Sequence, residues 1–438
     1  MPIKSIQAVC ATSKGISRKE ILFDSESGLI KSVGECKLPK SNVDFFYDDD
    51  FLLFAGMGDI HIHAREDISG INNYKEDFNS VCCAALNGGL VHVADMPNNP
   101  VPPIDDKSYL SKVDLGAKSL VPILMYAGIG PETRPLSFSV PYKAYMGPSV
   151  GDLYFKSNAD LENVLKHYRH QWVSFHCEDP EILDQNKNKS DHFKRRPIQA
   201  ELMATDFALA LIEKFELKGK LCHYSAGDGL NAIRAARKKG ISVTCEVTPQ
   251  HLFFTEERIR AMKPAEQILF QMNPPIRTIS DSKKLMDALR NNEIDYLATD
   301  HAPHSPKEKA AGMSGLTGLD TYAAFVTWLL IDQKISAETI AFITTENPGR
   351  FFNQFLESLN KKTELYKKWG KGMGFLEPDF SASFTVINLK KSHTVTNANI
   401  KTKALWSPFL GVTFPGSLEA VFLSGNIMFD KPDQSDQL

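Results

Sequence analysis

Four well-separated stretches of the chain end in histidine or aspartate, residue types that hold divalent metal ions. His61 and His63 are two residues apart after an apolar run, so their side chains are expected on one face of a strand. An isolated pair of this kind is more often two solvated or hydrogen-bonded histidines. His176, His223 and Asp300 close three later apolar runs. Four such endings together predict a site for Zn²⁺ or a similar ion rather than unrelated core histidines.

Lys143 lies inside a further apolar run, YKAYMG at 142–147. An inward-pointing amine there would be a buried cation beside metal ions, and both desolvation and repulsion would favour loss of its charge. Reaction of the neutral amine with CO₂ would give a carbamate, an anion able to bridge two cations. The alternative is a lysine whose amine extends to solvent at the rim of the site.

Strand-like runs that carry these residues alternate with helix-like segments. The runs are 51–63, 90–96, 119–129, 142–147, 172–179, 220–226, 242–248 and 294–302. Helical periodicity occurs at 74–89, 158–170, 196–215, 229–240 and 280–292, whereas the proline-rich segment 130–141 is expected to lack a full helix. This alternation predicts an α/β fold, a TIM (β/α)8 barrel whose site lies at the carboxyl ends of the strands.

The two ends of the chain have a different pattern, with short strands and turns rich in Gly, Pro and Ser. We expect residues 1–50 and 375–438 to form one small β-rich domain beside a barrel domain at 51–374, although two independent appendages would fit the same pattern. The last residues, DKPDQSDQL at 430–438, are polar enough to be disordered.

Composition restricts the class of protein and of partner. The 438 residues include 50 Lys and Arg against 53 Asp and Glu, a net charge of −3, which gives no drive toward nucleic acid or anionic lipid. No run approaches the length of about 18 apolar residues that a membrane span needs, and the first residues do not form a secretory signal. A small-molecule partner is therefore expected.

The seven cysteines are scattered and never spaced C-x-x-C. They predict buried thiols in a reducing compartment, the cytoplasm, rather than disulfides or a zinc–thiolate site. Cys177 and Cys222 adjoin His176 and His223, so strand alternation predicts that they point to the opposite face and pack in the barrel.

The chain resembles the dihydroorotase family of the amidohydrolase superfamily over nearly its whole length. The matching stretches, in the family's order and spacing, are DIHIHARED, KEDFNSVCCAALNGGLVHVADMPNNP, YKAYMG, FHCEDPEI, RRPIQAE, CHYSAGDGLNAIRAARKKG, CEVTPQHLFFT, MNPPIRT, ATDHAPHSPKEK and ENPGRFF. The resemblance implies a cyclic amidohydrolase that converts N-carbamoyl-L-aspartate reversibly to L-dihydroorotate and water, in the de novo synthesis of pyrimidines.

The resemblance also implies two Zn²⁺ ions per subunit. In this reading His61, His63 and Asp300 hold one ion, His176 and His223 hold the other, and N6-carboxylated Lys143, formed with CO₂, bridges the two. Asp300 would in addition be the catalytic residue, acting as general base and then as general acid.

Four further residues correspond to the family's substrate contacts: Arg65, Asn98, Asn273 and His304. The fork of Arg65 suits a carboxylate, but without the motif a surface salt bridge to Glu66 or Asp67 would be favoured. The two asparagines stand beside prolines and could instead form turns. Arg65 together with His304 favours an acidic ring substrate over the uncharged rings of hydantoinases. His301 is expected to point away from substrate.

The chain departs from the family pattern at two places. Gln250 stands in the stretch Pro249-Gln250-His251-Leu252 where a histidine is usual, and Asp67 stands where proline is usual. The segment 147–158 is a candidate for a loop that closes over substrate. The family further suggests a homodimer and contact with aspartate transcarbamoylase. The competing readings are a hydantoinase or dihydropyrimidinase type of enzyme, and a catalytically silent partner of the transcarbamoylase.

Overall fold

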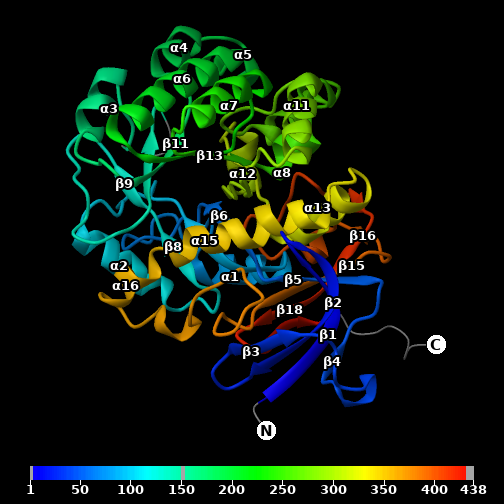
Figure 1. The fold of residues 1–438 in the computed structure, drawn as a ribbon. Coiled ribbons are helices and arrows are strands. Elements are labelled where there is room, and N and C mark those ends of the chain that lie inside the picture. The colour runs from blue at the N-terminus through cyan, green and yellow to red at the C-terminus, as the bar shows by residue number, and fades with distance from the viewer. Residues whose placement is uncertain (1–2, 149–152, 431–438) are drawn as a thin grey trace.

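The computed structural model describes residues 3–148 and 153–430. Parallel strands alternate with helices in its central part, and a larger mixed sheet gathers both ends of the chain below them in Figure 1. This is the α/β class that the sequence predicts. Two predicted segments lie partly outside the described residues. They are the proposed closing loop at 147–158, through its residues 149–152, and the polar tail at 430–438, through its residues 431–438.

Parallel strands form two sheets that run in chain order. The first sheet contains β6 (Met57–Ile62), β7 (Leu90–Asp95) and β8 (Ile123–Met125). The second contains β9 (Ala127–Ile129), β10 (Tyr142–Tyr145), β11 (Trp172–His176), β12 (Lys218–Leu221), β13 (Val243–Val247) and β14 (Tyr296–Leu297). The sheets approach each other at both ends. Tyr126 N donates to Asp95 O at 2.9 Å, and Ile62 forms a parallel bridge with His301.

Two of the expected strands are in fact two strands each. The run 51–63 divides into β5 (Phe51–Ala55), which pairs with the terminal sheet, and β6, and the run 119–129 divides into β8 and β9. Hydrophobicity could not reveal either break, because the residues on both sides are buried. Gly56 marks the first break, since a Cβ there would lie 2.1 Å from the Val91 side chain.

All five segments with helical periodicity are helices. They are α1 (Phe78–Asn87), α3 (Asn158–Leu165), α6 (Ile198–Phe215), α7 (Leu230–Lys238) and α11 (Ile279–Arg290). Asp77, Ser157 and Thr278 cap three of them by accepting backbone N–H groups. Residues 130–141 contain no helix, as their prolines predict.

Other helices were not singled out by the sequence pattern. They are α2 (Asp106–Gly116), α4 (Pro180–Asn186), α5 (His192–Arg195), α8 (Pro249–Phe253), α9 (Glu256–Arg260), α10 (Pro264–Gln267), α12 (Pro306–Ala310), α13 (Tyr322–Ile331), α14 (Ala337–Ala341), α15 (Asn347–Asn353) and α16 (Leu356–Asn360). Most of these helices are too short to show a clear amphipathic pattern. The helix α13 is longer, but it is apolar along nearly its whole length and so shows no such pattern either.

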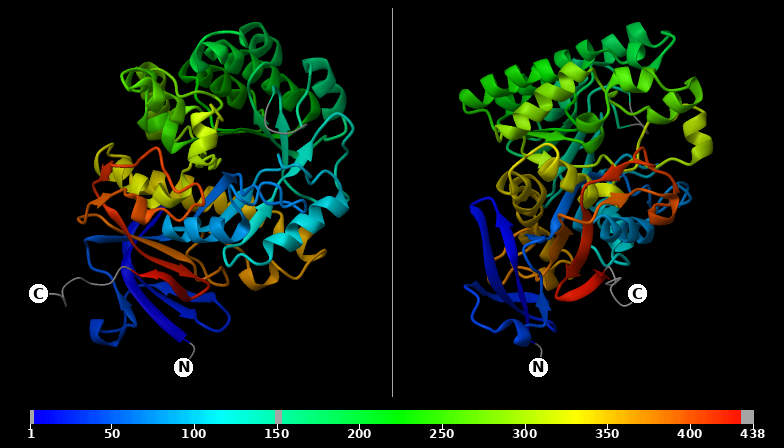
Figure 2. Two further views of the ribbon diagram at one scale, coloured as in Figure 1. Left: turned by 180° about the vertical axis from the view of Figure 1, so that it is seen from behind. Right: turned by 90° about the vertical axis from the view of Figure 1, so that its right-hand side faces the viewer.

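Strands from both ends of the chain pair in one eight-stranded sheet. It comprises β1 (Ile3–Thr12), β2 (Gly15–Asp24), β3 (Leu29–Gly34), β4 (Phe45–Phe46), β5, β15 (Phe384–Asn388), β18 (Ser417–Leu423) and β19 (Asn426–Asp430). A separate small sheet joins β16 (His393–Thr394) to β17 (Thr413–Phe414). The large sheet has its own core, where Phe384 packs against Phe23 and Phe422 with ring centroids 5.9 Å apart. In the left view of Figure 2, the blue strands from the start of the chain and the orange and red strands from its end lie together at the lower left, where β5 pairs with β15.

All seven cysteines are free thiols, in agreement with the absence of a disulfide framework. Five are buried, but Cys36 and Cys83 are exposed, so the expectation of buried thiols is wrong for these two. Among the residues described, no helix has the length and apolar character needed to cross a membrane.

A substitution of Gly88, at the end of α1, tests how closely this helix packs against the segment that precedes α13. A Cβ at Gly88 would lie 1.8 Å from the backbone oxygen of Leu319, so we expect Gly88→Ala to destabilise the protein by about 1–3 kcal/mol. Gly34→Ala is the control, since no atom lies within 4 Å of that position. Chemical denaturation of both variants measures the difference, and equal stabilities would contradict this account.

Candidate metal centre

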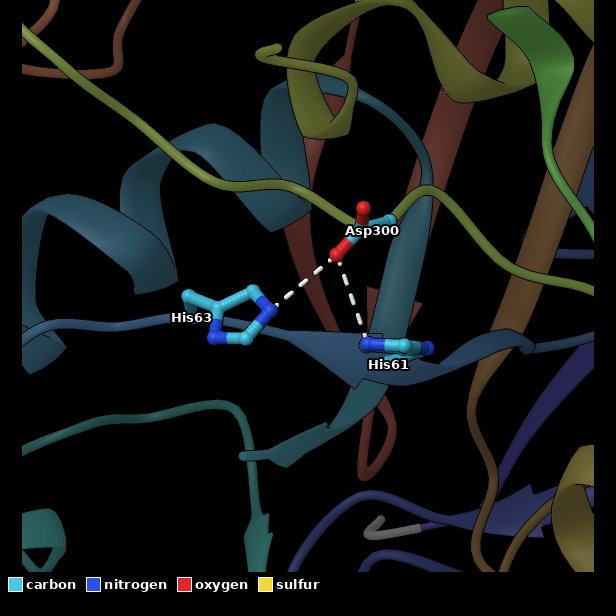
Figure 3. Close-up of side chains that lie close together, drawn as sticks. All are labelled: His61, His63 and Asp300. Carbon is cyan, nitrogen blue, oxygen red and sulfur yellow. Dashed lines mark hydrogen bonds and ion pairs between the residues drawn. The ribbon is translucent and has the colours of Figure 1, made fainter. Parts of the chain in front are cut away.

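His61, His63 and Asp300 meet at the end of the first parallel strand (Figure 3). Asp300 Oδ1 lies 3.0 Å from His63 Nε2 and 3.3 Å from His61 Nε2. His61 belongs to β6, His63 follows it, and Asp300 follows β14. All three are buried. The prediction that the two imidazoles share one face of the strand is therefore confirmed, and they could hold one ion together with the carboxylate.

His176 and His223 form a second group beside the first. His176 ends β11 and His223 follows β12, and His176 Nδ1 lies 2.9 Å from His223 Nε2. The ring centroids of His223 and His61 are 5.2 Å apart. The structure thus brings together all five His and Asp residues that the sequence singles out.

The amine of Lys143 is enclosed by the protein. Lys143 is 0% exposed, and its Nζ has no hydrogen-bond partner among the residues described. The alternative of a lysine extending to solvent is therefore wrong. After burial, the charge of Lys143 is among the causes that lower the pKa of His61, His63, His176 and His223. The amine thus lies close to both histidine groups, where an unpaired cation is costly.

Several buried polar atoms around these residues also lack partners within the described part of the chain. Besides Lys143 Nζ they include Arg65 Nε, Tyr145 Oη, His223 Nδ1 and His304 Nδ1. Buried polar groups in folded proteins nearly always have a hydrogen-bond partner. So many unpartnered buried polar atoms in one region indicate a binding site. Its nitrogen and carboxylate donors suit a zinc ion.

Neighbouring oxygens that accept hydrogen bonds from the rings orient three of the imidazoles. His61 Nδ1 lies 2.6 Å from Glu246 Oε1, His63 Nδ1 lies 2.6 Å from Asn98 Oδ1, and His176 Nε2 lies 2.8 Å from Glu178 Oε2. Oxygen partners of this kind fix the tautomer of a ligand histidine and leave its other nitrogen free for a metal.

Sequence reasoning missed Glu178, Glu246 and Tyr145. Glu178 follows His176 by two residues, and Tyr145 follows Lys143 by two residues, so strand alternation could have found both. Glu246 is a charged residue in the middle of a buried strand, CEV, which is itself an unusual feature.

Burial sets the protonation of the site. It lowers the pKa of His61, His63 and His223 well below the usual range, so these imidazoles are neutral, the form that binds metals. Burial also raises the pKa of Asp300 to about 7, while the nearby charge of Lys143 acts in the opposite direction.

Arg65 and His304 lie together at the edge of this group. Arg65 is 4% exposed, and one of its terminal nitrogens lies 3.4 Å from His304 Nε2. The expected alternative, a surface salt bridge, is wrong, because Glu66 pairs with Lys118 and Asp67 accepts hydrogen bonds from Ser69. Burial, and then the charge of Arg65, lower the pKa of His304 to about 2, which makes it neutral. The two side chains together carry one positive charge, on the Arg65 guanidinium, which forms no ion pair with a carboxylate among the residues described.

The two asparagines differ in their surroundings. The Asn98 carbonyl contacts His63, which leaves its amide N–H groups for other partners. Asn273 is partly exposed, and its Oδ1 has no hydrogen-bond partner among the residues described. His301 points away as expected, because its ring contacts Glu76 at 3.1 Å.

Cys222 is placed differently from the prediction. Its sulfur lies within 4.8 Å of ligand atoms of both His61 and Glu246, so it faces the interior of the site. The predicted packing of Cys222 in the buried core is confirmed. Only its predicted direction, opposite to His223, is wrong, because His223 has a positive φ of 37° and strand alternation does not continue through such a turn. At the seventh strand, Gln250 is buried and donates to Thr317 O at 3.4 Å, so the unusual residue fits its loop.

Solved structures that resemble this chain include hydantoinases. The chain superimposes on L-hydantoinase (dihydropyrimidinase) from Arthrobacter aurescens with a TM-score of 0.84 and 20% identity, over 99% of this chain and 97% of that one. D-hydantoinase from Thermus sp. gives a TM-score of 0.81 at 16% identity, over 97% and 95% of the two chains. The chain therefore shares the fold of these proteins.

Sequence relatives narrow the class further. Dihydroorotase of Pyrococcus horikoshii is 30% identical over 383 residues, which cover 86% of this chain and 81% of that protein. Dihydroorotase of Methanosphaera stadtmanae is 28% identical over 97% of both chains. No protein-family model matches the chain. The chain belongs to the dihydroorotase family and is a cyclic amidohydrolase.

Metal content tests this arrangement. We expect His63→Ala to bind less zinc per chain than the unaltered protein, because His63 contacts Asp300 within one group of donors. His167→Ala is the control, since His167 is exposed whereas the proposed donors are buried. Elemental analysis after dialysis gives the stoichiometry. Equal zinc content in the two variants would contradict the assignment.

Proposed function

We propose that the protein is a dihydroorotase, which closes N-carbamoyl-L-aspartate reversibly to L-dihydroorotate with loss of water. The observation that carries the proposal is the buried Arg65, whose guanidinium forms no ion pair with a carboxylate among the residues described and lies beside neutral His304. A substrate carboxylate would neutralise it, and both the substrate and the product of this reaction carry one. Membership of the dihydroorotase family supports the same choice.

The residues present fit two zinc ions per subunit. We assign His61, His63 and Asp300 to one ion, His176 and His223 to the other, and Lys143 to a bridge between them. When bound, such ions supply Lewis acidity to the reacting carbonyl group. The unpartnered, buried Nζ of Lys143 supports the bridge, because its carboxylated form would be an anion instead of a buried cation.

Carboxylation of Lys143 needs only CO₂. The nitrogen of the neutral amine forms a bond to the carbon of CO₂, one N–H proton leaves to solvent, and the product is a carbamate anion. The neutral amine is the nucleophile in this step, and Lys143 is fully buried among the proposed ligands.

Asp300 carries the proton in the proposed reaction. In ring closure its carboxylate takes the proton from the ureido nitrogen as that nitrogen forms a bond to the side-chain carboxyl carbon of the substrate. The carbon–oxygen bond then breaks, and the oxygen leaves as water with protons from Asp300 and solvent. In hydrolysis the same carboxyl group returns the proton to the ring nitrogen. Arg65, Asn98, Asn273 and His304 would hold the substrate during both directions.

We infer that the two parallel sheets close into one TIM (β/α)8 barrel. The bridge between Ile62 and His301, together with the hydrogen bond from Tyr126 to Asp95, supports this inference. The proposed domains are the barrel at 51–374 and a β-rich domain from 1–50 and 375–438, and by its pairing 51–55 belongs with the β-rich sheet.

We further propose a cytoplasmic homodimer that acts on a small molecule rather than on nucleic acid. The net charge of −3 and the free thiols support this assignment. Contact with aspartate transcarbamoylase is part of the same proposal. A silent partner is less well supported, because all the residues proposed as ligands are present and gathered.

A hydantoinase type of activity is the second candidate, because the solved structures with this fold are hydantoinases. Purified protein should hydrolyse dihydroorotate and not the uncharged ring dihydrouracil if Arg65 selects a carboxylate. Turnover of dihydrouracil without turnover of dihydroorotate would favour the second candidate.

Arg65→Met tests the carboxylate contact. Loss of a charge-assisted hydrogen bond is worth about 1.5–3 kcal/mol, so we expect KM for dihydroorotate to rise about 10- to 150-fold while zinc content stays constant. Arg169→Met, at an exposed arginine paired with Glu216, is the matched control. An unchanged KM in Arg65→Met would remove Arg65 from the substrate site.

Lys143→Ala tests the bridge. We expect the variant to lose most of its activity, and short carboxylic acids such as acetate or propionate to restore part of it by occupying the place of the carbamate. Initial rates over a range of acid concentrations measure the rescue, with the unaltered protein as the control for nonspecific effects. Full activity of the variant without added acid would exclude the bridge.

A further inference from the structure

A buried ion pair lies beneath the proposed metal ligands. Lys220 of β12 and Glu246 of β13 are both 0% exposed, and the Lys220 amine contacts the Glu246 carboxylate. Aromatic rings surround the amine, with the centroids of Tyr126, Tyr296 and Phe351 at 5.6, 6.0 and 5.8 Å. Glu246 therefore balances a charge that its apolar surroundings cannot solvate.

The Glu246 carboxylate also contacts both groups of proposed ligands. Its Oε1 lies 2.6 Å from His61 Nδ1 and accepts a hydrogen bond from the backbone N–H of His223 at 2.9 Å. Its backbone oxygen accepts the next N–H, that of Tyr224, at 2.7 Å. One residue thus holds a side chain of the first group and the backbone of the second.

These contacts determine how the two imidazoles are presented. A neutral imidazole has one N–H, and donation from His61 Nδ1 to the carboxylate leaves the lone pair on Nε2, the atom 3.3 Å from Asp300. His223 has a positive φ of 37°, an unfavourable conformation for a side chain of its size. The two hydrogen bonds to Glu246 hold the backbone in this turn, which directs the His223 ring toward His176.

Other oxygen partners contact a single ligand each. Glu178 contacts His176 and pairs with Arg196, which keeps 15% of its side chain exposed, and Asn98 contacts His63. The Lys220 and Glu246 pair differs in its complete burial and in its contact with both groups.

We propose that Lys220 and Glu246 act as one positioning unit that sets the tautomer of His61 and the orientation of His223, residues assigned to two different zinc ions. The inference rests on the zinc site of the proposed function. The ammonium group of Lys220 balances the carboxylate charge, so that Glu246 accepts from His61 and His223 together. Neither residue contacts the substrate in this proposal.

Zinc affinity of the purified full-length protein tests the unit. Glu246→Gln keeps the size of the side chain and one acceptor oxygen but removes the charge. We expect its zinc affinity, measured by competition with a chromophoric chelator, to fall about 10- to 100-fold. Asp295→Asn is the matched control, because Asp295 accepts the N–H of the neighbouring Cys245 at 2.7 Å but contacts no proposed ligand. The control should lower the melting temperature and leave zinc affinity unchanged.

The double variant Glu246→Gln, Lys220→Met separates positioning from stability. Glu246→Gln alone leaves the Lys220 charge unpaired, so its metal-free form should melt at a lower temperature, and the added Lys220→Met change should restore much of that loss. Zinc affinity should remain low in the double variant, because the carboxylate is still missing.

Two outcomes would overturn the proposal: unchanged zinc affinity in a folded Glu246→Gln variant, or recovery of zinc affinity in the double variant. Failure of the proposed function is distinguishable, because in that case the unaltered protein itself would bind no zinc and would not hydrolyse dihydroorotate.

Discussion

Burial of the Lys143 amine among the proposed ligands is the constraint on which the site depends. The amine is fully enclosed, lacks a hydrogen-bond partner in the described chain, and influences both histidine groups. A lone ammonium group in this position would be costly and would repel cations. The proposed conversion to a carbamate would place an anion between the two groups instead of a cation. The proposed carbamate would therefore serve the chemistry of the site, because it holds two cations, and also its stability, because it removes a buried positive charge.

Several residues of the site have a strained backbone conformation, and buried carboxylates stabilise it. Arg65, His223 and Asp300 all have positive φ values, of 64°, 37° and 48°. Asp95 accepts the N–H of Ala64, immediately before Arg65, at 2.7 Å, as Glu246 accepts that of His223. Such conformations persist only where the surrounding contacts determine them. Contacts between strands that are distant in the sequence thus determine the directions of the functional side chains.

Much of the fold follows from periodicity, and the exceptions have physical causes. The helices at 198–215 and 279–290 were predictable because their apolar residues recur at helical spacing. The division of 51–63 between two sheets was not, because both halves are equally apolar and the division depends on which strands they pair with.

The ligand candidates were predictable for a similar reason, since histidine and aspartate are conspicuous at the ends of apolar strands. The role of Glu246 was not, because it depends on which groups its carboxylate contacts in the folded chain. Cys222 was placed wrongly because its position follows a turn at His223, which no pattern of residue types reveals.

The state of Lys143 in the zinc-loaded protein is the most direct test of this account. Full-length protein can be equilibrated with zinc and ¹³C-labelled bicarbonate and then analysed by ¹³C NMR. The account predicts a carbamate carbon signal that is absent from Lys143→Met prepared in the same way. Zinc-loaded, active protein without that signal would contradict it.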